Sequence, residues 1–143
     1  MFQIRPCRLE DFDAVVGLLR QLWPDESLEV DSLRAVFARG LSAESQAYFC
    51  VVAGGCVVGF GSIMLKNNLW QAGYLAHVDE LVVDREHRGK GVGSQLLKQL
   101  ITFARQRGCR RIELDSAFHR KEAHEFYQRH GFENRALLFS KTL

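Results

Sequence analysis

A run of glycines and basic residues between positions 88 and 94 could bind a phosphate group. Glycine permits a sharp bend and lets a ligand approach the backbone closely. An apolar stretch precedes this run and a helical pattern follows it, so the free amides of the helix start would point at an anion. The residues of this predicted pyrophosphate site are Arg88, Gly89, Lys90, Gly91, Val92, Gly93 and Ser94.

Three titratable side chains stand just before this run, on the stretch that leads into it. They are His77, Asp79 and Glu80. Each could take a proton from a reacting group, and an imidazole has an ordinary pKa near neutrality. Alternation along a strand places His77 and Asp79 on one face and Glu80 on the other, unless a bulge changes the count. Any of the three could equally be a solvated or hydrogen-bonded strand residue.

The spacing of the glycines separates three types of phosphate loop. A Walker loop needs Gly-Lys followed by Ser or Thr, which is absent, and the spacing 89, 91, 93 departs from the dinucleotide fingerprint. Arg88, Gly91 and Gly93 match Arg/Gln-x-x-Gly-x-Gly/Ala instead. This pattern resembles the acetyl-CoA loop of the GNAT superfamily of N-acetyltransferases. A second match lies about thirty residues later, where the segment 123–132 is similar to the family's Ala-x-x-Phe-Tyr-x-x-x-Gly-Phe segment.

The resemblance implies which residues meet the co-substrate, acetyl-CoA. In the family, the pantetheine arm pairs with the strand that here contains Leu81, Val82 and Val83. A bulge in that strand turns one amide toward the thioester oxygen, so Leu81 or Val82 is expected to stabilise the oxyanion. Phe126, in the second motif, joins the expected cofactor-binding set.

The resemblance also gives roles to the titratable side chains. Residues matching His77 and Asp79 are those that the family commonly directs at the amine, where Asp79 would orient the ammonium and His77 would accept its proton. Glu80 is the alternative base. Tyr127 is the expected acid that protonates the leaving thiolate, although helical spacing alone would make it a core aromatic.

Hydrophobic periodicity predicts the elements that position these groups. We expect strands at 2–6, 48–53, 56–66, 74–84, 111–115 and 135–142, and helices at 8–22, 28–39, 91–107 and 120–130. This order resembles that of the whole GNAT domain, and the resemblance implies an α/β GNAT fold: a mixed, mostly antiparallel sheet with a central parallel strand pair, flanked by about four helices. Residues 1–143 would form a single N-acetyltransferase domain.

The composition of the chain bears on which partners, metals and cellular compartment we expect for it. The net charge is only +2 and no stacking motif occurs, so nucleic acid is not expected. No segment is suited to a signal peptide or a membrane span. Four scattered cysteines indicate a reduced, cytoplasmic protein. No metal is expected either, because the histidines lack the spacing of a zinc helix.

The resemblance to the GNAT superfamily implies direct acetyl transfer to a primary amine, and we expect that amine to belong to a small molecule. The polyamine, aminoglycoside and aminoalkylphosphonate classes all stay open: acidic residues in the N-terminal half favour a cationic acceptor, whereas a phosphonate would need an anion site, with Arg120 as a candidate. The alternatives are a protein N-terminal or lysine acetyltransferase and a non-catalytic acetyl-CoA sensor. The apolar segment 136–139 further predicts pairing with another subunit in a homodimer.

Overall fold

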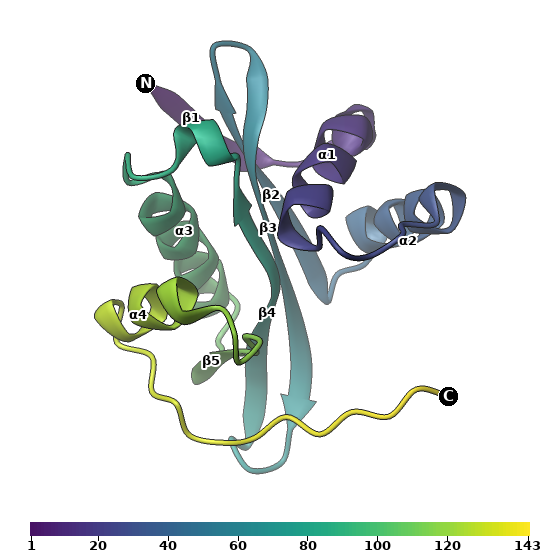
Figure 1. Cartoon of the computed structure of the whole chain (residues 1–143). Helices are drawn as coiled ribbons and strands as arrows, with labels where there is room; N and C mark the ends of the chain where they lie inside the picture. Colours follow the sequence, from purple (N-terminus) through teal and green to yellow (C-terminus); the bar gives the residue numbers. More distant parts are fainter.

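The computed structural model describes residues 1–143, and its centre is a five-stranded sheet with helices on both faces (Figure 1). In spatial order the strands are β1 (Phe2–Pro6), β2 (Gln46–Ala53), β3 (Cys56–Asn68), β4 (Gly73–Val83) and β5 (Arg111–Leu114). The helices are α1 (Phe12–Leu22), α2 (Val30–Ser42), α3 (Val92–Gln106) and α4 (Lys121–Arg129), with short 3-10 turns η1 (Leu9–Asp11) and η2 (Arg85–His87). The first four strands pair antiparallel, and β5 runs parallel to β4.

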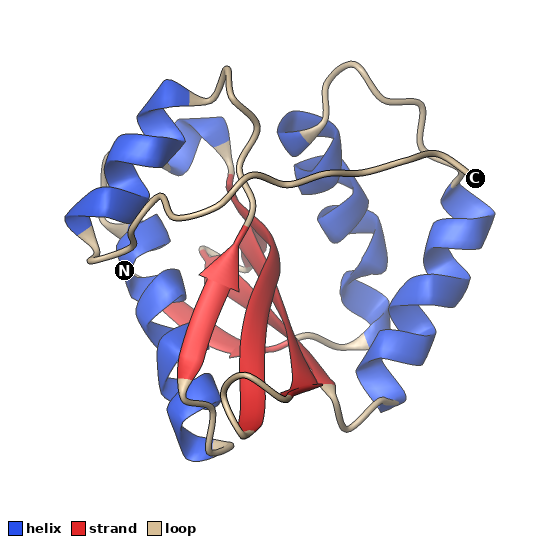
Figure 2. Ribbon diagram, turned by 90° about the horizontal axis from the view of Figure 1, so that it is seen from below, coloured by secondary structure: helices blue, strands red, loops and turns tan.

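Each face of the sheet buries its own apolar cluster. Figures 1 and 2 show α1 and α2 on one side of the sheet and α3 and α4 on the other. Leu96 and Leu100 of α3 pack with Ile63 of β3 on one face. Phe12 of α1 and Phe37 of α2 pack on the other. Alternate residues of the strands supply both clusters, as the period of a strand requires.

A bulge in β4 changes which side chains share a face. Ser62 of β3 pairs with Glu80, but the next residue, Ile63, pairs with Val78, so Asp79 is the extra residue. Val78 faces the α3 cluster, whereas Val82 belongs to the α1 and α2 cluster. The sequence left open that a bulge changes the alternation, and the structure has that bulge: one inserted residue reverses the parity of every side chain after it.

The parallel pair β4–β5 ends early and opens. Its register runs from Leu75 opposite Arg111 to Val78 opposite Leu114, where β5 ends while β4 continues. The residues that follow Leu114 therefore lie beside the bulge of β4. This opening between the two strands is where the structure places its candidate chemistry.

Three predictions about the elements need correction. The helix expected to end at Gly40 continues to Ser42. Gly40 serves close packing instead, since a Cβ there would overlap the ring of Tyr48. No strand forms at 135–142, where the chain is exposed and irregular and crosses one end of the sheet toward the side of α2 (Figures 1 and 2). Because no strand follows β5, the parallel pair lies at the end of the sheet rather than at its centre.

Candidate active site

The glycine loop forms a bend whose amides are free. Gly89 and Gly91 have φ values of 73° and 81°, which side-chain-bearing residues rarely adopt. The first hydrogen bond of α3 runs from the N–H of Gln95 to the carbonyl of Gly91, at 3.1 Å. The three amides before Gln95 precede that bond, so they can donate to an anion. These amides are therefore available to an anion, and the pyrophosphate site at positions 88–94 stays a prediction.

Asp84 fixes the start of this loop. Its carboxylate accepts hydrogen bonds from Gln21 of α1 at 2.8 Å and from the backbone N–H of Glu86 at 3.3 Å, and it lies 3.0 Å from the Nδ1 atom of His87. The hydrogen bond from Gln21, followed by the contact with His87, lowers the pKa of Asp84 below its usual value. The loop is thereby tied to α1 on the far side of the sheet.

The loop contacts α4 through Gly93. A Cβ at Gly93 would lie 3.6 Å from the ring of Phe126 and 3.7 Å from Val83. Phe126 in turn meets Tyr127 edge to face, with ring centroids 5.3 Å apart. Two of the residues predicted to bind the co-substrate, Phe126 and Val83, thus lie next to the loop. The two sequence motifs meet in space although thirty residues separate them.

A cavity of about 270 Å³ occupies the opening between β4 and β5. The bulge of β4, the segment after β5, α4 and the turn after α1 all contribute to its walls. Its lining residues are Leu22, Trp23, Pro24, Asp25, Glu26, Val78, Asp79, Glu80, Leu81, Leu114, Asp115, Ser116, Ala117, His119, Arg120 and Tyr127. A base candidate and the acid candidate therefore face one space.

Glu80 has a local environment that suits a base. The hydroxyl of Ser62 donates a 2.5 Å hydrogen bond to Glu80 Oε1, and the backbone N–H of Glu80 donates to that hydroxyl at 3.0 Å. Burial raises the pKa of Glu80 above its usual value, and the bond from Ser62 opposes the rise. A carboxyl group whose pKa moves toward neutrality can both take and return a proton under ordinary conditions.

Tyr127 is buried on α4, with 9% of its surface exposed. Burial raises the pKa of Tyr127, and the positive charge of Arg120 opposes that rise. Its hydroxyl therefore stays protonated at neutral pH and can act as a proton donor. The ring also packs edge to face on Phe132 at 5.8 Å, so the helix of the second motif holds it in place.

His77 is bound differently from the sequence expectation. Its Nδ1 lies 2.8 Å from Asp79 Oδ1 and its Nε2 lies 3.2 Å from Asp115 Oδ2. The hydrogen bond with Asp79 raises the pKa of His77, burial opposes this, and the charges of Asp79 and Asp115 add to the rise. The imidazole is thus held between two carboxylates and does not line the cavity. Asp79 and Glu80 do line it.

The other predicted residues divide between the cavity and the core. Leu81 lines the cavity, whereas Val82 packs in the α1 and α2 cluster. The sequence reasoning did not single out Asp115 and Ser116, which follow β5. The signal that could have found them is the predicted parallel pairing of β5 with β4, which brings the residues after β5 to the bulge.

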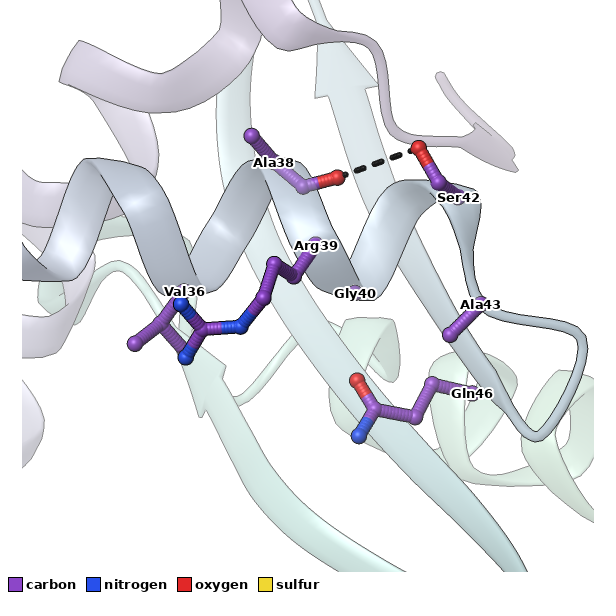
Figure 3. Close-up of a pocket in the computed structure, with 7 residues that line it drawn as sticks. All are labelled: Val36, Ala38, Arg39, Gly40, Ser42, Ala43 and Gln46. Atoms are coloured by element: carbon purple, nitrogen blue, oxygen red, sulfur yellow. Dashed lines mark hydrogen bonds between the residues drawn. The ribbon is translucent and has the colours of Figure 1, made fainter.

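Two other features carry no comparable set of groups. A hollow of about 670 Å³ lies at the end of α2 (Figure 3), and its lining includes no acid, thiol or imidazole. Cys7, Asp11 and Cys50 form a buried cluster that could hold a metal by distance. However, Arg5 binds both oxygens of Asp11, at 2.8 and 2.9 Å. The hydrogen bond with Cys50, together with burial, raises the pKa of Cys7, so its thiol stays protonated. Because a metal binds the thiolate, we interpret the cluster as part of the packed core and not as a metal site.

No helix of the chain combines sufficient length with sufficient apolar character to span a membrane.

Known proteins resemble this chain along nearly its whole length. Residues 12–132 match the model of the acetyltransferase (GNAT) family. The aminoalkylphosphonate N-acetyltransferase of Salmonella typhimurium is 34% identical over 141 residues, covering 99% of this chain and 91% of that protein. Glucosamine 6-phosphate N-acetyltransferase 1 of Oryza sativa is 31% identical over 137 residues, covering 92% and 81%.

A solved structure agrees with these sequence matches at the level of the fold. An aminoglycoside N-acetyltransferase in complex with CoA superposes with a TM-score of 0.86 at 23% identity, covering 100% of this chain and 96% of that one. This chain has the glycine loop, the bulged strand β4 and the helix α4 of the second motif. The chain therefore belongs to the GNAT acetyltransferase family and is an N-acetyltransferase with acetyl-CoA as its co-substrate.

Proposed function

We propose that this enzyme transfers the acetyl group directly to the primary amine of a small molecule. The observation that carries the proposal is the shared cavity of Glu80 and Tyr127, which opens where β4 and β5 diverge. Acetyl transfer needs a base that deprotonates the amine and an acid that protonates the leaving thiolate, and both groups must reach the same cavity. None of the four cysteines lines the cavity, which favours direct transfer over an acyl-cysteine intermediate.

Glu80 is the proposed base. A primary amine arrives as an ammonium, which has no free electron pair, and Glu80 takes its proton directly or through one water. The raised pKa of Glu80 keeps this transfer within reach at neutral pH. Asp79 lines the same wall and orients the ammonium by charge. His77 lies between the carboxylates of Asp79 and Asp115, its hydrogen bond with Asp79 raises its pKa, and it positions Asp79, so we propose Glu80 rather than His77 as the base.

Leu81 and Tyr127 serve the second half of the transfer. Bound acetyl-CoA supplies the acyl carbon that the neutral amine attacks and the thiolate that leaves. The backbone amide of Leu81, which lines the cavity next to the bulge, is the proposed donor to the oxygen that gains charge. Tyr127 then gives its proton to the departing sulfur. The amides and side chains of residues 88–94 hold the pyrophosphate. Phe126 and Val83 both lie next to Gly93 of this loop.

The acceptor class follows from the size and charge of the cavity. A space of about 270 Å³ suits a small molecule better than a protein N-terminus or a lysine side chain on a folded surface. The acids of the cavity favour an ammonium. Polyamine, aminoglycoside and aminoalkylphosphonate acceptors all offer one. A sensor that only binds acetyl-CoA would have no need of the paired Glu80 and Tyr127.

The assembly and the location are also proposals. The segment 134–143 is exposed, and its apolar side chains have no cover within the chain: Leu137, Leu138 and Phe139 are 66%, 68% and 87% exposed. We propose that a second copy covers this segment in a homodimer. All four cysteines are free, which supports a cytoplasmic location.

A thiol-release assay with a panel of amines tests the proposed activity. The panel contains spermidine, kanamycin, 2-aminoethylphosphonate, glucosamine 6-phosphate and a lysine peptide, each with acetyl-CoA. We expect release of CoA to depend on at least one of the small amines. Binding of acetyl-CoA without release by any of the amines would favour the sensor. Turnover of the peptide alone would favour a protein acetyltransferase.

A further inference from the structure

Arg120 lines the cavity without a counter-ion. It is partly buried, it stands immediately before α4, and its guanidinium makes no ion pair or hydrogen bond within the chain. The other partly buried arginine, Arg5, has a carboxylate partner in Asp11. A guanidinium presents five donors in a planar fork that matches the oxygens of a phosphate or phosphonate. An arginine with these donors free on a cavity wall is the group expected at an anion site.

Two further sets of donors lie beside Arg120. Ser116 also lines the cavity, and its Oγ is the one buried polar side-chain atom in the molecule without a hydrogen-bond partner. Rotation about χ1 can bring this hydroxyl to the cavity. The first hydrogen bond of α4 runs from the N–H of His124 to the carbonyl of Arg120, so the amides of Glu122 and Ala123 precede it. No side chain caps this nine-residue helix. Arg120 and Ser116 therefore line the same cavity, and the first turn of α4 follows Arg120 directly in the chain.

The charges of the cavity match a ligand that carries both signs. The bulge of β4 contributes Asp79 and Glu80, and the turn after α1 contributes Asp25 and Glu26. The imidazole of His77 contacts both Asp79 and Asp115, so Glu80, Asp25 and Glu26 are the cavity carboxylates without a contact to it. The wall at the start of α4 has the opposite sign, from Arg120. A polyamine would have to place an ammonium against this guanidinium, whereas a zwitterionic acceptor would satisfy both walls.

We infer that Arg120, Ser116 and the first turn of α4 form an anion subsite for a phosphonate or phosphate monoester group on the amine acceptor. The inference rests on the proposed function, because it assigns the acceptor of the same cavity. The tetrahedral group accepts two parallel hydrogen bonds from Arg120 and further bonds from Ser116 and the helix amides. Its amine then reaches the carboxylates of Asp79 and Glu80.

A binding experiment tests the subsite apart from catalysis. Methylphosphonate and methyl phosphate are titrated by calorimetry into the protein saturated with CoA, which occupies the glycine loop. The variants are Arg120→Gln, Arg120→Lys and Ser116→Ala, and Arg129→Gln, exposed at the other end of α4, is the control. Loss of one charged partner should weaken binding about 10- to 100-fold in Arg120→Gln. Arg120→Lys and Ser116→Ala should weaken it less, and Arg129→Gln should bind as the wild type does.

Matched acceptors test the same subsite in turnover. 2-Aminoethylphosphonate and phosphoethanolamine separate the two anion sources, and ethanolamine lacks the anion. The wild type should have a higher kcat/KM for an anionic acceptor than for ethanolamine. Arg120→Gln should lose about 10- to 100-fold of that preference, mainly through KM, and the rate with ethanolamine, which carries no anion, should change much less. Preserved far-UV circular dichroism checks the fold of each variant.

Three results would overturn the subsite: equal binding of methylphosphonate by the wild type and Arg120→Gln, equal losses for ethanolamine and its phosphorylated analogue, or weaker acetyl-CoA binding in Arg120→Gln. The last result would assign Arg120 to the co-substrate instead. Failure of the proposed function looks different. No amine would then be acetylated, while Arg120-dependent binding of methylphosphonate would persist and still support the subsite.

Discussion

The hydroxyl of Ser62 lies 2.5 Å from Glu80 Oε1, at the point where β4 bulges. The bond links the middle of β3 to the carboxyl group that we propose as the base. It also accounts for two opposing influences on that group, since burial raises the pKa of Glu80 and the hydroxyl lowers it. The acid–base behaviour of the enzyme should therefore depend on both residues.

Glu80→Gln should lower kcat by about 100-fold or more, because general base catalysis is worth roughly 10²–10⁴-fold. Glutamine keeps the size of the side chain and cannot take the proton. Steady-state thiol release measures the rate, and calorimetry should give an unchanged affinity for acetyl-CoA. Glu125→Gln, exposed on α4, is the matched control. A rate close to wild type in Glu80→Gln would return the role of base to Asp79 or to a water chain.

Ser62→Ala should move the acidic limb of the pH–rate profile to higher pH. The base must be ionised, so the rate falls as the pH drops through the pKa of Glu80. The hydroxyl of Ser62 lowers that pKa, and its removal raises it further. The rate at the high-pH plateau should change little. Profiles of kcat/KM for Ser62→Ala and for the exposed control Ser45→Ala measure the displacement. A shift to lower pH would contradict the assignment.

Tyr127→Phe should reduce kcat about 100-fold while acetyl-CoA affinity stays nearly unchanged. The ring and its packing on Phe126 remain, and only the proton donor is lost. Single-turnover measurements should place the loss in the chemical step. Tyr74→Phe removes a hydroxyl from an exposed tyrosine and serves as control. If Tyr127→Phe kept full activity, protonation of the thiolate would have to come from solvent.

His77 should contribute pH-dependent stability. Its pKa is raised in the folded state by Asp79 and Asp115, so the favourable contribution is fully present below the unfolded pKa of about 6.5. It is lost as the pH rises through the folded pKa. The difference in free energy of unfolding between wild type and His77→Gln should therefore shrink from pH 5.5 to pH 9 in urea titrations. His119→Gln, at an exposed histidine, should show no such trend. If the difference in free energy of unfolding grew with pH, the stabilising contacts of His77 with Asp79 and Asp115 would be refuted.

Removal of residues 134–143 should convert a dimer into a monomer. The deleted segment carries the exposed Leu137, Leu138 and Phe139 and makes no strand with its own chain. Sedimentation equilibrium should give the full-length protein twice the 16.3 kDa mass of one chain. Lys141→Ala, a change in the same segment without loss of apolar surface, should leave the dimer intact. A full-length protein that sediments as one chain would end the dimer proposal.

The sequence by itself determined the local elements and the two motifs. Glycines at 89 and 91 allow the positive φ values that the bend needs. The helix, strand and helix that follow the bend are predicted by hydrophobic periodicity, which depends only on near neighbours in the chain. The candidate acetyl-CoA loop and Tyr127 are singled out by the resemblance of the two motifs to the GNAT family and not by periodicity. The terminal strand at 135–142 could not be judged, because an apolar alternating segment does not reveal whether an edge is available to it.

Tertiary structure alone decided where the titratable groups lie relative to one another. The bulge at Asp79 depends on the register of β4 against β3, which no pattern within β4 reveals, and it sets Glu80 in the cavity. Asp115 and Arg120 reach the site only because β5 ends beside that bulge and α4 starts there. Local spacing fixes which residues can share an element, whereas the pairing of distant strands fixes which side chains meet.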